Sequence, residues 1–149
     1  MLSASALSFV MIPLFGHLSD GLGRKRVYMM GAILTGIYGS VYFRLLDTMV
    51  PELVFLAILL SLIPHDMLYG PQAALIAESF PAHLRYSGAS LGYQLSSVIA
   101  GGPSPLIAAW LLGRYQSGMA IAVFILVSAI VRLLATAALT DRTNKELAS

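Results

Sequence analysis

The sequence predicts an all-α fold: a polytopic membrane helix bundle with five transmembrane helices. Of its 149 residues, 58% are hydrophobic and only 11% are charged, and the mean hydropathy is +0.81. A soluble domain is about 45–50% apolar and about 25% charged, so this composition excludes an ordinary water-soluble globule. A disordered chain would be more polar still. Five apolar runs of membrane-spanning length, with the charges placed between them, support the same conclusion.

Each apolar run is about 17–25 residues long, which is the length that a helix needs to cross the hydrocarbon core. Strands of a β-barrel would be half as long and would alternate polar with apolar residues, which none of the runs does. We therefore expect a single transmembrane bundle over residues 1–149. Its spans are predicted at about 2–18, 27–46, 53–77, 88–112 and 119–139, followed by a cytoplasmic tail at 140–149.

The basic residues between the spans predict the orientation in the membrane. Six of them lie on one side, namely Arg24, Lys25, Arg26, Arg85, Arg142 and Lys145. The second and fourth connections hold only Arg44 and Arg114. Because cytoplasmic loops carry the excess of basic residues, we expect the N-terminus outside and the C-terminus cytoplasmic, in a plasma membrane such as the bacterial inner membrane. Arg132 lies inside the fifth run, and its head group is expected to extend to the cytoplasmic interface.

The sequence argues against several classes of function. It has no cysteine, and its three histidines are far apart. It also has no Gly-rich phosphate-binding loop that ends in Gly-Lys-Ser/Thr. We therefore expect no enzyme activity, no cofactor and no metal site. The net charge of +2 is too small to indicate nucleic-acid binding. Because the chain is expected to begin outside the membrane and to have an odd number of spans, we expect it to be the end of a longer protein.

The connection after the first span reads Gly16-His17-Leu18-Ser19-Asp20-Gly21-Leu22-Gly23-Arg24-Lys25-Arg26. Ser19 or Asp20 could cap the second helix. Gly21 and Gly23 would permit a tight turn. A turn whose charges only set the topology would explain this pattern. The run also resembles the helix-connecting motif of the major facilitator superfamily, although Gly21 stands where that family usually has a basic residue.

The connection after the third span places Glu78 at the end of one helix and Arg85 seven residues later, with Pro81 between them to stop the helix. It resembles the Glu-x6-Arg element that superfamily members carry after the tenth helix. A solvated turn is the simpler alternative. Together, the two connections would place two acidic residues and several basic residues on one membrane face.

A more specific resemblance lies in two further runs. They are Tyr69-Gly70-Pro71-Gln72-Ala73-Ala74 and Arg85-Tyr86-Ser87-Gly88-Ala89-Ser90-Leu91-Gly92-Tyr93-Gln94-Leu95. Both are similar to the metabolite:proton symporter family of that superfamily, whose members have twelve helices in two halves. The resemblance aligns the five runs with the eighth to twelfth helices, and so implies a partial major-facilitator fold.

Two polar residues of the third run, His65 and Asp66, lie midway between its ends and so near the bilayer centre. An ionised carboxylate there costs at least a few kcal/mol, so it must face protein or water, or stay protonated. His65, Tyr69 and Gln72 share one helix face by their spacing. We expect this face to line a transport pathway, with His65 or Asp66 as proton carrier. A buried polar pair that only fixes helix packing beside Pro64 is the alternative.

The fourth run has a polar stripe and an interruption. The stripe comprises Ser90, Gln94, Ser97, Gly101 and Ser104, and we expect Gln94 and Ser97 to belong to the pathway. Pro103 and Pro105 remove two backbone donors and should kink the span. Freed carbonyls at this depth are tolerated where protein covers them or where they line a cavity. A kink without any ligand is equally compatible with the sequence.

The resemblance implies the C-terminal part of a secondary active transporter that moves a small organic metabolite by proton-coupled symport. Asp20, Gly23, Arg24, Glu78 and Arg85 would then form a cytoplasmic gate or latch. Its partners would be the small organic solute and protons, the lipid bilayer, and the missing N-terminal half or a complementary membrane subunit. The fragment should be inactive alone. A non-transporting remnant, an accessory subunit and a small homo-oligomeric channel remain as alternatives.

Overall fold

The computed structural model describes residues 2–139, apart from the side chains of residues 2–5 and 82. Its helices are α1 (Leu2–Leu22), α2 (Arg24–Asp47), α3 (Pro51–Glu78), the 3-10 turn η1 (Ala82–Leu84), α4 (Arg85–Ser96), the π-helical turn η2 (Ser97–Gly101), α5 (Pro103–Tyr115) and α6 (Gly118–Ala138). The predicted all-α fold is confirmed. The predicted tail at 140–149, with Arg142 and Lys145, lies outside the described residues.

Four helices are long and apolar enough to cross a membrane, namely α2, α3, the continuous segment 85–115 and α6. The segment 85–115 combines α4, η2 and α5 into one span. In α1, the apolar stretch Ala6–Leu22 is shorter than the other four. Five helical segments therefore correspond to the five predicted spans, and the first four extend beyond at least one end of their apolar runs.

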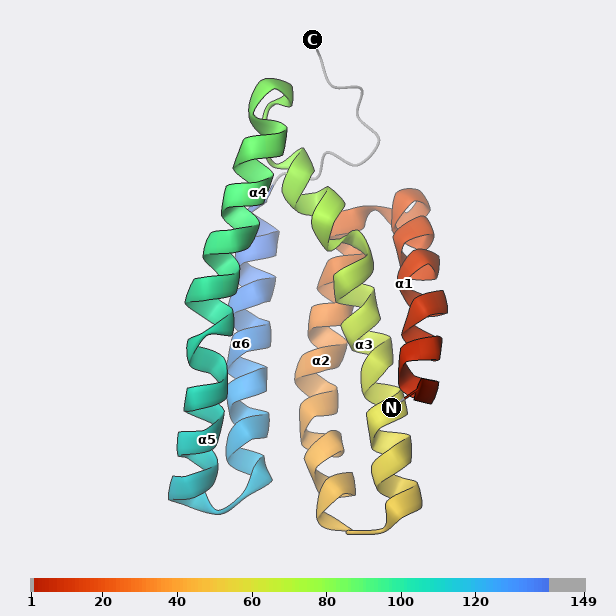
Figure 1. The fold of residues 1–149 in the computed structure, drawn as a ribbon, viewed down its shortest axis with the longest axis vertical. Helices are drawn as coiled ribbons and strands as arrows, with labels where there is room; N and C mark the ends of the chain where they lie inside the picture. The colour runs from red at the N-terminus through yellow and green to blue at the C-terminus, as the bar shows by residue number, and fades with distance from the viewer. Residues whose placement is uncertain (1, 140–149) are drawn as a thin grey trace.

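All five segments run along one long axis, as Figure 1 shows. The connections at 48–50 and 116–117 lie at one end of the bundle, and those at 23 and 79–84 lie at the other with the end of α6. Helix α2 packs on both α3 and α6, and α1 packs on α3. Helix α4 packs on α3, whereas α5 packs on α6. The basic residues at 24–26 and 85 thus share one end, as the charge pattern predicts.

Small residues set the closest helix contacts. A Cβ atom added at Gly70 of α3 would lie 2.9 Å from the backbone oxygen of Ile12 and the backbone nitrogen of Gly16, both in α1. At the α2–α6 contact, a Cβ at Gly36 would lie 3.2 Å from the Ala129 Cβ. Glycine lets helix backbones approach this closely, which is how membrane helices gain packing contacts in lipid.

The turn between α1 and α2 differs from the predicted one. Gly23 is the residue before α2 and has a φ of 98°, which suits glycine. The expected side-chain cap by Ser19 or Asp20 is wrong, because α1 continues through both residues to Leu22. The Ser19 hydroxyl instead donates to the Gly16 carbonyl at 2.6 Å. Gly21 lies within the helix and makes no turn.

The interruption of the fourth span lies one turn before the two prolines. The π-helical turn η2 covers Ser97–Gly101, and Pro103 opens α5, where a missing N–H is tolerated. Proline clashes with the carbonyl of the residue four positions earlier. For Pro103 and Pro105 those residues are Ile99 and Gly101, which both belong to η2. The extra residue in this turn relieves the two clashes without ending the span.

Candidate functional site

Asp66 is a fully buried carboxylate in the middle of α3, with 0% of its side chain exposed. Its Oδ1 accepts a hydrogen bond from the Ser8 hydroxyl of α1 at 3.3 Å. The same oxygen lies 2.9 Å from Nδ1 of His65. Oδ2 is buried and has no hydrogen-bond partner among the described residues. A membrane helix thus holds an acidic group whose second oxygen lacks a donor.

His65 connects this buried carboxylate to open space. Its side chain is 63% exposed, although its Nδ1 faces Asp66. The imidazole stacks on the ring of Tyr69, with 5.7 Å between the ring centroids and 12° between the planes. Since Nδ1 is engaged by the carboxylate, Nε2 is the ring nitrogen left for water or a ligand. The pair therefore joins a buried acid to a group that solvent reaches.

His65 and Tyr69 line an open cavity of about 490 Å³ whose walls come from α2, α3, α4, η2 and α6. Gln72 and Ser97 line it too, so the structure brings four of the six predicted pathway residues together. Asp66 lies behind His65. Gln94 is exposed on α4 and is not among the lining residues. The predicted face of α3 is thus the wall of a real cavity.

Sequence reasoning missed three side chains of this cavity, namely Tyr28 of α2, Tyr93 of α4 and Arg132 of α6. Tyr69 of α3 and Tyr93 of α4 both line the cavity. Tyr93 lies in the run that resembles the symporter family, and Arg132 is the only charged residue of the fifth apolar run. Those two signals could have identified both residues.

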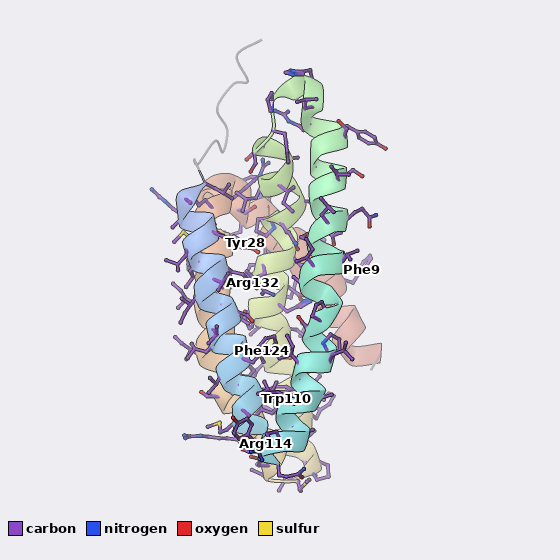
Figure 2. All side chains as sticks on the ribbon, turned by 90° about the vertical axis from the view of Figure 1, so that its left-hand side faces the viewer. Phe9, Tyr28, Trp110, Arg114, Phe124 and Arg132 are labelled. Atoms are coloured by element: carbon purple, nitrogen blue, oxygen red, sulfur yellow. The ribbon has the colours of Figure 1, made fainter. Side chains whose placement is uncertain are left out.

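A second cavity of about 220 Å³ lies between α2, α3 and α6. It shares His65, Leu68 and Arg132 with the larger cavity. Figure 2 shows Arg132 beside Tyr28 in the opening between α6 and α4. Arg132, whose head group is expected to extend to the cytoplasmic interface, lines both cavities.

A charge cluster lies at the end of the bundle that holds the first and third connections. The Arg24 guanidinium donates to Asp20 Oδ1, through Nη2 at 2.7 Å and Nε at 3.1 Å. It also pairs with Glu78 Oε1, which ties α2 to the end of α3. Gly23 forms the turn that places Arg24 there. Three of the predicted latch residues therefore make one ion-pair network.

Arg85 lies near this cluster in sequence but is not paired in it. Within residues 2–139, Glu78 forms its ion pair with Arg24, and no ion pair involves Arg85. Its Nε and Nη2 are buried without hydrogen-bond partners in that part of the chain, as is Glu78 Oε2. In this conformation the acidic residue of the predicted Glu-x6-Arg element, Glu78, forms an ion pair. Its basic residue, Arg85, forms none within residues 2–139.

Comparison with known proteins identifies the class. The family model of the Major Facilitator Superfamily matches residues 1–149. The chain therefore belongs to this superfamily of multi-pass membrane transporters. The predicted resemblance is confirmed at this level. Among the described residues, no group of three or more His, Asp or Glu side chains could hold a metal ion. No solved structure matches the chain.

Particular relatives can be named. The chain is 34% identical to the shikimate transporter of Escherichia coli strain K12 over 142 residues, which are 94% of this chain and 32% of the relative. It is 37% identical to the inner membrane metabolite transport protein YhjE of the same strain over 120 residues, 79% of this chain and 27% of the relative. The proline/betaine transporter of that strain is 29% identical over 135 residues, 91% of this chain and 27% of the relative. The chain thus spans between about a quarter and a third of these relatives' length.

Proposed function

We propose that this chain forms the C-terminal part of a secondary active transporter that moves a small organic solute together with protons. The observation that carries the proposal is the buried Asp66, which His65 connects to a cavity of about 490 Å³. Membership of the superfamily and relatives named for shikimate, metabolite and proline/betaine transport support a small solute.

The proton step follows from the cost of burying a charge. An ionised Asp66 in the membrane costs free energy, which Ser8 and His65 offset at Oδ1 only. A proton taken up by the carboxylate neutralises it and removes that cost. His65 can accept a proton from the cavity at Nε2 and pass one to Asp66 from Nδ1. The two residues therefore form a proton-binding pair at the cavity wall.

The charge cluster supplies the gate on the proposed cytoplasmic side. Arg24 holds the start of α2 against Asp20 and Glu78 while that side is closed. Exposed ion pairs each contribute about 0.2–1 kcal/mol, so a network of them can bias a conformational equilibrium and still release in every cycle. In this proposal Arg85, whose Nε and Nη2 have no hydrogen-bond partner among the described residues, pairs with Glu78 when the connections rearrange.

The chain should not transport alone. No residue of the described helices α4, η2 and α5 is buried, so much of the surface of this span is left uncovered. We propose that further helices, from the same or a second polypeptide, cover that span and close the cavity. The same observation favours a second candidate function, an accessory subunit that packs on a partner transporter.

We also propose the inner membrane as location, with the N-terminus outside and the C-terminus cytoplasmic.

A chimera tests the proposal. This chain replaces the aligned segment of the Escherichia coli shikimate transporter, and proteoliposomes are assayed for accumulation of labelled shikimate driven by a pH gradient. We expect Asp66→Asn to abolish accumulation of shikimate against its own concentration gradient. Exchange of shikimate across the membrane should persist. Asp47→Asn, which neutralises the carboxylate at the C-terminal end of α2, is the matched control.

Two outcomes would contradict the proposal. Gradient-driven accumulation by the Asp66→Asn chimera would remove Asp66 from proton coupling. Accumulation by liposomes that contain this chain alone would refute the need for further helices. A chimera that assembles, as judged by size-exclusion chromatography of a fluorescent fusion, and that exchanges no solute would favour the accessory subunit.

A further inference from the structure

Arg132 is placed where a membrane arginine is costly. It lies six residues before the end of α6 and lines both the large and the small cavity. Charged side chains inside membrane spans face a water-filled cavity or a partner, and they mark the paths of substrates and ions. The position of Arg132 in Figure 2, in the opening toward α4, agrees with a guanidinium that faces the cavity.

The charge of Arg132 has no counter-ion in the described part of the chain. None of the ion pairs or hydrogen bonds between residues 2–139 involves its guanidinium. The carboxylate beside the cavities, Asp66, is fully buried and is already bonded to Ser8 and His65. A cavity that holds an uncompensated guanidinium attracts an anion.

We propose that Arg132 anchors the carboxylate of a small organic anion in the larger cavity, opposite His65. Guanidinium groups bind carboxylates through two parallel hydrogen bonds. Tyr69 and Tyr93 offer hydroxyl groups and aromatic walls for the rest of the molecule. A cavity of about 490 Å³ lies in the usual range of about 300–1,000 Å³ for small-molecule sites. The assignment of substrate class rests on the proposed function, whereas the anion site itself does not.

The same geometry couples anion binding to protons. The titratable and charged groups that face His65 across the two cavities are Tyr28, Tyr38 and Tyr42 of α2, Asp66 and Tyr69 of α3, Tyr93 of α4 and Arg132 of α6. Protonation of His65 adds a second cation beside Arg132, so a carboxylate between them binds more tightly as the pH falls. By reciprocity, the bound carboxylate favours protonated His65 by the same factor.

Binding of a fluorinated carboxylate tests the site. The full chain is placed in lipid nanodiscs, and 4-fluorobenzoate binding is followed by fluorine NMR with 4-fluorobenzamide as the neutral analogue. A charge-assisted hydrogen bond is worth about 1.5–3 kcal/mol, so we expect Arg132→Gln to weaken benzoate binding about tenfold or more. Arg132→Lys should restore part of it. Arg114→Gln, which removes an exposed arginine from α5, is the matched control and should leave binding unchanged.

The pH dependence provides the second measurement. Benzoate binding should tighten as the pH falls through the range in which histidine titrates, and His65→Gln should abolish this dependence while Arg132 still binds. Circular dichroism of each variant shows whether its helices are intact. Benzoate binding by a helical Arg132→Gln variant equal to that of the unmodified chain would overturn the proposal. That result would indicate that the Arg132 guanidinium extends to the lipid head groups instead.

The outcomes separate this inference from the proposed function. Equal binding of 4-fluorobenzoate and 4-fluorobenzamide, or an equal loss in Arg114→Gln, would likewise overturn the anion site. If Asp66→Asn leaves gradient-driven uptake intact but Arg132→Gln abolishes benzoate binding, proton coupling through Asp66 fails while the anion site stands. If gradient-driven uptake requires Asp66 but Arg132→Gln leaves benzoate binding unchanged, proton coupling through Asp66 stands while the anion site fails.

Discussion

Replacing Gly70 with alanine should separate two helices of the bundle. The new Cβ would lie 2.9 Å from two backbone atoms of α1, the oxygen of Ile12 and the nitrogen of Gly16. Ordinary contacts of this kind begin at about 3.4 Å. Backbone atoms cannot rotate away as a side chain can, so α1 must shift as a whole. Gly113 of α5 offers the matched control, because a Cβ there meets nothing within 4 Å.

The magnitude follows from two opposing terms. Overpacking of a close contact costs about 1–3 kcal/mol. Alanine regains about 1 kcal/mol of helix propensity relative to glycine. Since both clashes at Gly70 are with backbone, the upper part of the first range applies. Gly70→Ala should therefore destabilise the chain by about 2 kcal/mol, whereas Gly113→Ala should stabilise it by up to about 1 kcal/mol.

Unfolding in mixed micelles with increasing dodecyl sulfate, followed by circular dichroism, measures both variants against the unmodified chain. The expected order of transition midpoints is Gly113→Ala highest, then the unmodified chain, then Gly70→Ala. A midpoint for Gly70→Ala at or above that of the unmodified chain would refute the close approach of α1 and α3. A loss of equal size in Gly113→Ala would show that the effect is not one of packing.

Three further predictions concern other contacts. Gly88→Ala should destabilise the chain by about 1–3 kcal/mol, because its Cβ would lie 2.5 Å from the Phe80 ring, and Phe80→Leu should rescue it in the same unfolding assay. Tyr38→Phe should lower the unfolding free energy by about 0.5–1.5 kcal/mol, since the Tyr38 hydroxyl donates to a backbone carbonyl of α3 at 2.9 Å; an unchanged midpoint would contradict that bond. Glu78→Gln breaks the pair with Arg24 and should raise maleimide labelling of a cysteine placed in the first connection several-fold, and labelling that stays constant would exclude the latch.

The sequence was enough to predict the class of fold and the number of spans. Long uninterrupted apolar runs permit only helices in a bilayer, and basic residues had to gather at one end. His65, Tyr69 and Gln72 were also predicted to share a face, because the helical period fixes which side chains lie above one another. These features depend on a single helix and its surroundings.

Features that depend on a neighbouring helix were harder to predict. The position of Arg132 along α6 gave its depth, but the rotation of α6 against α2 decides that it faces the cavities. Ser19 was a good capping residue by type, yet α1 continued past it, because Gly23 supplied a better turn. The pairing of Glu78 with Arg24 rather than Arg85 depends on how the two connections meet in space.

The π-helical turn divides the fourth span between two neighbours. On its N-terminal side α4 packs on α3, and on its C-terminal side α5 packs on α6. Within the described residues, α4 makes no packing contact with α6. The turn therefore separates two half-spans that pack on different helices. A rotation at Ser97–Gly101 would widen or narrow the cavity from one side while the contact between α5 and α6 stays closed.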